Sequence, residues 1–304
     1  MSRLRLSPAF DIVSTEAGLL VRSDLVTSQI TGSDARRLME KLLPLLDGSR
    51  DRAAILAALG GAPAAVAAFL DRLVARGAVE AVPEAPPSAR ARGQRLFFRA
   101  WSADADAATA RLVAAHVVVA GRSRWAQAAA RELAAAGVDA IEGPLALRDV
   151  AAALARRSES TLVIAAVPPE DTERLARLTQ AASVPSLWAR RSGTVVAIGP
   201  LVIPGQTACR VCAMETSVSA ALSEMNRERA VRGGTASDGL LGHLVALEAI
   251  KVITRYAPTH LGGRTLIQDL VSWESTLHTL VRLPWCRVCG DEGRMTHASS
   301  RSPG

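Results

Sequence analysis

Short apolar runs and amphipathic stripes alternate along the first 82 residues of the chain. The apolar runs are rich in β-type residues and predict short strands, the first two joined as a hairpin. The stripes place apolar side chains at every third or fourth position, which predicts helices. Elements of this number and size predict a small α+β winged-helix domain over residues 1–82. The strands are predicted at 10–13, 18–22, 28–31 and 79–82, and the helices at 35–46, 51–59 and 63–76.

A composition change separates this unit from the rest of the chain. Pro83, Pro86 and Pro87 precede an arginine-rich stretch, which predicts a linker over residues 83–100. Apolar strand patterns then alternate with helical patterns, which predicts a doubly wound α/β domain over residues 101–293. The polar tail, 294–304, is expected to be disordered. Strands are predicted at 116–120, 139–142, 161–167, 186–189, 194–198, 264–269 and 276–282, and helices at 121–136, 145–157, 169–182 and 240–256.

The composition is that of a globular protein with a large core. Hydrophobic residues make up 49% of the 304 residues, and no charge-free apolar stretch reaches eighteen residues. The N-terminus lacks a signal-peptide pattern, so we expect a soluble, cytoplasmic protein without a membrane partner. The formal net charge of +7 fits nucleic acid, an acidic surface or an acidic peptide. Arginines scattered by a basic proteome explain it equally well, because no block of five cations occurs.

The chain has four cysteines, in two pairs with identical inner residues, Cys209-Arg-Val-Cys212 and Cys286-Arg-Val-Cys289. Two such pairs supply the ligand set of a closed, structural zinc site. The site would use every cysteine, so no thiol would remain as a catalytic nucleophile. Two disulfides in an oxidising compartment, a redox pair and an iron–sulfur cluster are the alternatives.

Several segments together resemble known families. The run Gly199-Pro-Leu-Val-Ile-Pro-Gly205, the stretch Ala246-Leu-Glu-Ala-Ile-Lys251 and the two cysteine pairs resemble the ThiF-like superfamily of adenylating enzymes, in which such pairs bind structural zinc. Leu42-Leu-Pro-Leu-Leu-Asp-Gly-Ser-Arg50 resembles PqqD-like recognition elements, which are winged helices that capture leader peptides. The whole chain is similar to the ThiF-like, leader-binding partner proteins of azoline-forming YcaO cyclodehydratases.

The turn after the first strand of the α/β domain departs from that superfamily. A nucleotide-binding turn is rich in glycine, so that backbone amides can approach the phosphates. This turn keeps Gly121 but carries Arg122, Arg124 and Trp125. No cysteine occurs between Ala213 and Trp285, where related thioester-forming enzymes place one. We therefore expect no catalytic residue, no bound ATP and a degenerate nucleotide turn.

The resemblance also implies where a leader peptide would lie. In such recognition elements the peptide joins the third strand and packs against the third helix. Gln29, Ile30 and Thr31 would offer the strand edge, and Phe69 and Leu73 would form the floor of the groove. Cationic side chains one turn apart would meet acidic leader residues. These are Arg72 and Arg76. The alternative is that Phe69 and Leu73 belong to the core and that the arginines are solvated.

Three functions are compatible with the sequence. The first is a non-catalytic, homodimeric accessory subunit that binds the leader of a ribosomally made precursor and presents it to a YcaO cyclodehydratase for thiazole or oxazole formation. The second is an ATP-dependent enzyme that adenylates a peptide or a small acid. The third is a winged-helix DNA-binding regulator. The predicted helix 63–76 carries only two cations and few polar base-reading side chains, which disfavours the regulator and nucleic acid as a partner.

Overall fold

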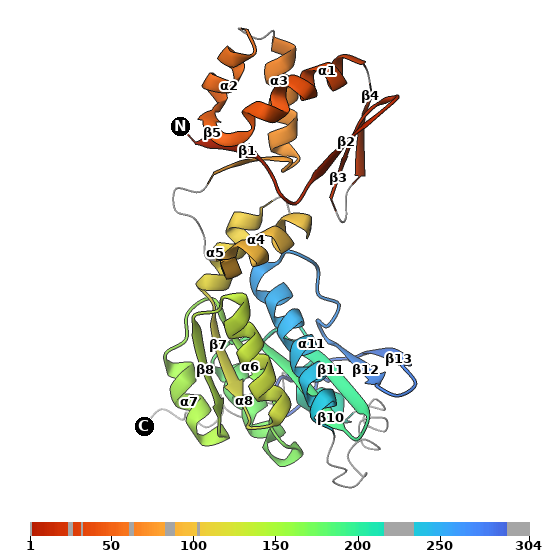
Figure 1. The fold of residues 1–304 in the computed structure, drawn as a ribbon. Helices are drawn as coiled ribbons and strands as arrows, with labels where there is room; N and C mark the ends of the chain where they lie inside the picture. Colours follow the sequence, from red (N-terminus) through yellow and green to blue (C-terminus); the bar gives the residue numbers. More distant parts are fainter. Residues whose placement is uncertain are drawn as a thin grey trace. The chain divides into compact units, whose positions relative to one another are not determined.

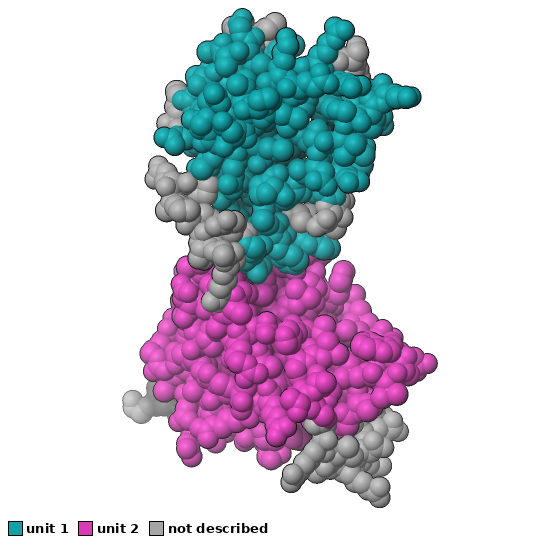
Figure 2. Space-filling view, viewed as in Figure 1, with its two compact units in different colours: residues 1–109 teal, residues 110–304 magenta. Residues whose placement is uncertain are grey.

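A computed structural model of the protein describes residues 2–23, 27–31, 33–60, 64–82, 89–101, 104–215 and 234–290. The predicted tail, 294–304, lies outside the described residues. The chain divides into two compact units, residues 1–109 and 110–304 (Figure 2). Among the described residues, no helix is both long enough and apolar enough to cross a membrane.

The first unit contains two antiparallel three-stranded sheets and three short helices that share one core (Figure 1). One sheet has the order β5-β1-β6 and the other the order β2-β3-β4. The strands are β1 (Arg3–Leu6), β2 (Asp11–Thr15), β3 (Gly18–Arg22), β4 (Thr27–Thr31), β5 (Asp47–Asp51) and β6 (Val79–Ala81). The helices are α1 (Ser33–Leu42), α2 (Arg52–Ala58) and α3 (Ala64–Ala75).

These elements confirm the predicted hairpin, the third strand and the three helices, and they add β1 and β5. The first helix ends four residues earlier than predicted, at Leu42, because Pro44 cannot continue an α-helix. The chain there forms the 3₁₀ turn η1 (Leu43–Leu45). The predicted start of the third helix, residue 63, lies outside the described residues.

The segment expected to be a linker is largely helical. Residues Ala89–Trp101 form α4, and Ala105–Val113 form α5, while residues 83–88 lie outside the described part of the chain. Phe98 of α4 is fully buried, and Arg99 forms an ion pair with the buried Glu80 of β6. Arg95 of α4 likewise forms an ion pair, with Asp106 of α5, so two of the arginines expected in a linker are paired within the fold.

The second unit is built on a seven-stranded mixed sheet with the order β13-β12-β11-β10-β9-β7-β8 (Figure 1). The pairs from β8 through β7 and β9 to β10 are parallel, and β10 to β13 pair antiparallel. The strands are β7 (His116–Ala120), β8 (Ala140–Leu145), β9 (Thr161–Ala165), β10 (Ser186–Ser192), β11 (Val195–Val202), β12 (Arg264–Asp269) and β13 (Ser275–Thr279).

Helices cover both faces of this sheet. The right-handed crossovers place α7 and α8 on the face opposite α6, and α11 packs along α6. The parallel half is therefore doubly wound, as predicted, whereas the antiparallel half makes the whole sheet mixed. The helical segments are α6 (Arg124–Ala136), α7 (Leu147–Ala155), η2 (Pro169–Asp171), α8 (Thr172–Ala181), α9 (Arg210–Glu215) and α11 (Thr235–Thr254).

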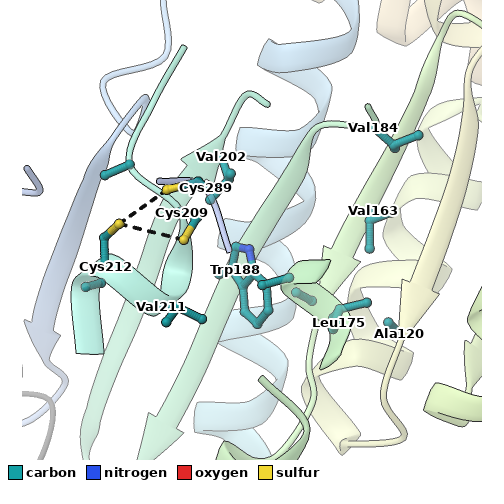
Figure 3. Close-up of a cluster of buried hydrophobic side chains, with 14 of the residues drawn as sticks. Ala120, Val163, Leu175, Val184, Trp188, Val202, Cys209, Val211, Cys212 and Cys289 are labelled. Atoms are coloured by element: carbon teal, nitrogen blue, oxygen red, sulfur yellow. Dashed lines mark hydrogen bonds between the residues drawn. The ribbon is translucent and has the colours of Figure 1, made fainter. Parts of the chain in front are cut away.

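The core on the α7–α8 face extends to the cysteines (Figure 3). Val118 of β7, Val163 of β9 and Trp188 of β10 point to this face, where Leu175 of α8 packs on them. Alternate strand residues such as Val117 and Val119 are equally buried and face the other side, as the period of a strand requires. The cysteine cluster therefore packs on the same hydrophobic core as this face of the sheet.

Candidate functional site

The four cysteines gather in one buried cluster at the end of the second unit's core. Figure 3 shows three of them, Cys209, Cys212 and Cys289. Cys209 precedes α9 and Cys212 lies within it, whereas Cys286 and Cys289 lie in the turn that follows β13. Their Sγ atoms all lie within 4.8 Å of one another. Two pairs that are distant in sequence thus form one ligand set, as the sequence predicted.

The distances between the sulfur atoms fit a metal ion and exclude disulfides. Sγ–Sγ distances are 3.8 Å for Cys209 and Cys212, 3.6 Å for Cys209 and Cys286, and 3.4 Å for Cys212 and Cys289. A disulfide needs about 2.05 Å. Four thiolates at about 2.3 Å from a tetrahedral zinc ion lie about 3.8 Å apart. The residues present therefore fit a structural metal with four sulfur ligands.

The ionisation of the thiols is unequal. Hydrogen bonds from neighbouring thiols, first that of Cys209, lower the pKa of Cys289 to about 5. Burial raises the pKa of Cys212 to about 12, and the pKa of Cys209 is also raised, mainly by its hydrogen bond to Cys289. Four ionised thiolates this close repel one another, and a bound cation removes that penalty. The cluster is therefore chemically suited to hold a metal ion.

The second cysteine pair is held by a tight backbone turn. The amide of Gly290 donates a 2.7 Å hydrogen bond to the carbonyl of Cys286. A Cβ atom at position 290 would lie 2.2 Å from the carbonyl oxygen of Pro284 and 2.6 Å from the nitrogen of Cys286. The guanidinium of Arg282 donates to the carbonyl of Cys289. Only glycine allows the chain to turn here, and this turn orients the two sulfur atoms.

The turn after β7, which we expected to be a degenerate nucleotide loop, packs closely on the neighbouring strand. Gly121 has φ +108°, and a Cβ atom there would lie 2.2 Å from the carbonyl oxygen of Ala166. Ser123 caps α6 by accepting a hydrogen bond from the amide of Ala126. Trp125 is buried within α6, whereas Arg122 and Arg124 are exposed. Close contact with the backbone of Ala166 thus explains why glycine is required at position 121.

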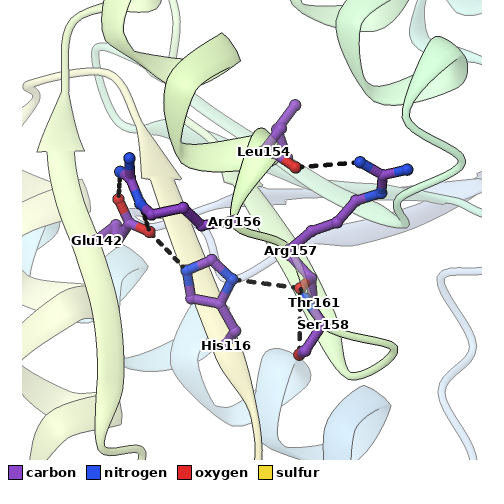
Figure 4. Close-up of polar contacts among 7 residues, drawn as sticks. All are labelled: His116, Glu142, Leu154, Arg156, Arg157, Ser158 and Thr161. Carbon is purple, nitrogen blue, oxygen red and sulfur yellow. Dashed lines mark hydrogen bonds and ion pairs between the residues drawn. The ribbon is translucent and has the colours of Figure 1, made fainter.

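The acidic residue of β8, Glu142, forms contacts within the protein away from the position of a nucleotide. The Glu142 carboxylate accepts a 2.9 Å hydrogen bond from His116 and pairs with Arg156 (Figure 4). His116 also contacts Thr161, and both residues begin their strands. This cluster therefore lies at the amino ends of β7 and β9, whereas ligands of open α/β sheets bind at the carboxyl ends. The hydrogen bond from Arg156 is the main reason that the pKa of Glu142 is lowered.

The predicted peptide-binding residues lie on two elements of the first unit. Gln29 and Thr31 are exposed on β4 and Ile30 is half-buried, while β4 forms one edge of the β2-β3-β4 sheet. Phe69 is 6% exposed and Leu73 is fully buried, both within the core. The cationic residues are exposed, one on α3 and one directly after it. These are Arg72, whose Nε donates to the carbonyl of Ala68, and Arg76.

A cavity of about 460 Å³ opens beside these elements, within the first unit. It is lined by Ser28 of β4, by Arg76 and Val74 at the end of α3, and by Trp101 of α4. Phe10, Val21 and Val79 add apolar wall, and Arg99 and Asp106 add charge. Of the predicted groove residues, only Arg76 lines it. The contribution of α4 could not be predicted, because the composition of that segment resembled a linker.

The comparisons with known proteins identify the fold. No family model matches the sequence, and no curated protein matches it. Escherichia coli MccB with ATP superposes with a TM-score of 0.66 at 16% identity, over 94% of this chain and 99% of MccB. The heterocyclase TruD gives 0.69 at 20% identity, over 100% of this chain and 45% of TruD. A heterocyclase in complex with substrate and cofactor gives 0.69 at 19% identity, over 100% and 42%.

These likenesses confirm a mixed α/β fold of the type seen in these solved structures. The chain spans nearly the full length of MccB but less than half of each heterocyclase. Because the sequence identities are 20% or lower, these likenesses show the fold alone. The chain thus has the fold of MccB and of the matching part of TruD.

Proposed function

We propose that this protein binds the leader of a ribosomally made precursor peptide and presents the precursor to a separate YcaO cyclodehydratase that forms azoline rings. In this proposal the first unit is a winged-helix recognition element, the second unit is a catalytically silent scaffold, and the chain works as a homodimer. Its structural neighbours include proteins named as heterocyclases, which supports a place in ring formation. A tethered leader raises the effective concentration of the core peptide at the partner's active site.

The unpaired outer edge of β4 is the observation that carries the proposal. Among the described residues, no strand pairs with β4 on the side away from β3. An edge strand offers free N–H and C=O groups, to which an extended peptide can add as a further strand. Ile30 packs on the core while Gln29 and Thr31 face outward, so the edge is anchored and accessible. Peptide affinity would come from the backbone, and choice of peptide from the side chains around it.

The cavity beside β4 and α3 supports the same use. Its walls combine Val74, Val79 and Trp101 with the guanidinium of Arg76. An apolar leader side chain would enter it, and an acidic neighbour in the leader would pair with Arg76. Phe69 and Leu73 would act from beneath, as core residues that hold α3 against the sheet. Arg72 would extend the cationic side of the groove.

Hydrogen–deuterium exchange with the cognate leader tests this directly. We expect micromolar or tighter binding by fluorescence anisotropy and slower exchange of the amides of β4. The opposite edge of the same sheet, β2, is the internal control and should exchange unchanged. Arg76→Glu should weaken binding at least tenfold, whereas Arg36→Glu, on the exposed part of α1, should not. Protection of β2 instead of β4, or no binding at all, would refute the proposal.

The alternative function is ATP-dependent adenylation, which the likeness to MccB favours. Against it, the turn after β7 keeps only Gly121, whose contact with Ala166 explains its presence. Thermal unfolding with ATP and magnesium separates the two functions, since a nucleotide bound to the native state raises stability. Leader binding without nucleotide-dependent stabilisation or pyrophosphate exchange is the result that our proposal expects.

A further inference from the structure

The two identical Cys-Arg-Val-Cys motifs hold their arginines in opposite ways. Arg287 lies on the surface, where its Nε is 2.8 Å from a Glu173 oxygen and its Nη1 is 3.6 Å from Glu215. Arg210 is 6% exposed, and its Nη1 atom is buried without a hydrogen-bond partner. A buried guanidinium is costly unless an acceptor satisfies it. The arginine of the first motif therefore lacks a hydrogen-bond acceptor, whereas the arginine of the second motif has two carboxylates as partners.

A second guanidinium faces the same place. Arg190 of β10 and Arg210 both line a small hollow, together with Trp188, Thr172 and Gly199. Among the described residues, neither arginine forms an ion pair or hydrogen bond with a carboxylate. Burial lowers the pKa of Arg190, so its charge is poorly hydrated. Two like charges therefore line one small hollow, and nothing from the described chain compensates them.

The position of the hollow is one that ligands of this fold class use. Val167 and Pro169, which follow the carboxyl end of β9, form part of its wall. Open α/β sheets bind ligands beyond the carboxyl ends of their parallel strands, near the point where the strand order reverses. Here that reversal lies between β9 and β7. The Gly121 turn fills the neighbouring position against Ala166, which leaves this hollow beside it.

We propose that Arg190 and Arg210 form a binding site for a single carboxylate group. Guanidinium groups match the planar carboxylate by parallel hydrogen bonds. The hollow measures about 20 Å³, which is room for about one water-sized group. It therefore suits one small anionic head and is too small for a nucleotide or a phosphate chain. The site takes the carboxylate of a small acid or of a peptide, and it is separate from the β4 edge.

The competing explanation is that Arg210 neutralises the neighbouring thiolates. Arg210 follows Cys209 directly in the chain. Its Nη1, however, makes no hydrogen bond to any sulfur atom, and the hollow that it lines contains none of the four cysteines. The test therefore measures metal content beside anion binding.

The experiment uses the full chain, purified in a buffer without carboxylates, and sodium acetate as the probe. Thermal unfolding is followed with increasing acetate, at constant ionic strength maintained with sodium chloride. We expect the midpoint to rise by about 2–4 °C when acetate reaches about ten times its Kd. Arg190→Gln should abolish most of this rise. Arg287→Gln, the matched change in the second motif, should retain it.

Each outcome bears on the proposal. An equal rise in all three proteins would mean a general salt effect and would overturn it, as would no rise in the wild type. Arg210→Gln should lose the acetate response and keep its bound metal. If that variant loses metal instead, while Arg190→Gln keeps the full acetate response, Arg210 serves the thiolates and the proposal is wrong.

A pair of peptides then identifies the source of the carboxylate. Acetyl-trialanine with a free C-terminus is compared with the same peptide ending in an amide. A larger rise with the free acid than with acetate assigns the site to a peptide terminus, whereas acetate alone assigns it to a small acid. Both results support the carboxylate site. An equal rise with the amide would overturn it. Since acetate and alanine peptides lack any leader sequence, failure here leaves the leader-binding proposal unaffected.

Discussion

The sulfur atoms of Cys209 and Cys286 lie 3.6 Å apart although 77 positions separate them in the chain. One lies between β11 and α9 and the other in the turn after β13, so the contact joins two segments that follow strands of the antiparallel half of the sheet. A metal at this point would cross-link these two segments, which are far apart in the sequence. The stability of the second unit should therefore depend on it.

Substitution of one ligand tests this dependence. We expect the purified protein to contain one zinc ion per chain by mass spectrometry of metals, and Cys212→Ser to lose it. The thermal midpoint of the second unit should then fall by 10 °C or more, because metal-binding free energy contributes to folding free energy. Arg287→Gln is the control and should keep its zinc. An intact protein mass about 4 Da lower than the reduced chain would indicate two disulfides instead.

A glycine at the crossing of α6 and α11 should be irreplaceable. A Cβ atom on Gly242 would lie 2.5 Å from the Cβ of Ala128 and 2.7 Å from the carbonyl oxygen of Trp125. Gly242→Ala should therefore destabilise the protein by about 1–3 kcal/mol through overpacking. Gly239 lies on the same helix with nothing within 4 Å of its virtual Cβ. Gly239→Ala should stabilise it by up to about 1 kcal/mol in urea unfolding. Equal effects at both positions would contradict the close packing.

Glu80 should contribute far more to stability than an exposed acid in the same unit. Its side chain is 3% exposed and pairs with Arg5 at 2.5 Å and with Arg99 of α4. Glu80→Ala leaves the partly buried guanidinium groups of Arg5 and Arg99 without this carboxylate and should cost about 3 kcal/mol. Asp71 pairs with Arg52 at 2.8 Å, but both side chains are about half exposed. Asp71→Ala should cost no more than about 1 kcal/mol, measured by the same denaturation. A small effect at Glu80 would mean that α4 is not bound through this ion pair.

Stability should depend on pH through Glu142. Its pKa is lowered in the folded state, chiefly by the hydrogen bond from Arg156. The carboxylate therefore stabilises the fold above its unfolded-state pKa, and this contribution is lost as pH falls through the lower folded-state pKa. Glu142→Gln should cost up to about 1 kcal/mol at pH 7, and the difference from wild type should shrink as the pH falls below about 4, the usual range of a free glutamate. Glu159→Gln, at an exposed position, is the control. A difference that is as large in acid as at pH 7 would contradict this assignment.

Several features could be predicted from the sequence because their signal is local. The apolar runs of β7 and β9 and the stripes of α3 and α11 reflect burial that repeats with the period of the element itself. The cysteine spacing likewise predicted that two turns would meet, since two Cys-x-x-Cys pairs together form the ligand set of one metal site. The departure at Gly121 was visible because a nucleotide turn demands glycines that this chain lacks.

Other features depended on contacts between distant segments. β5 is the polar run Asp47–Asp51 and forms a strand only because β1 pairs with it. α4 resembled a linker, because its stability comes from the buried Phe98 and the Glu80 pair rather than from its own composition. By sequence, Phe69 and Leu73 fitted either a groove or the core, with the core favoured for Phe69, and packing placed both in the core.

The two Cys-Arg-Val-Cys motifs show both what the sequence determined and what only the tertiary structure decided. The sequence by itself determined that the four thiols form two Cys-x-x-Cys pairs, because a pair of metal ligands is defined by a spacing of only three residues. It could not determine that Arg287 would meet Glu173 and Glu215 while Arg210 would be buried opposite Arg190. Two identical motifs therefore have different surroundings, since burial and charge pairing are properties of the folded chain and not of the local sequence.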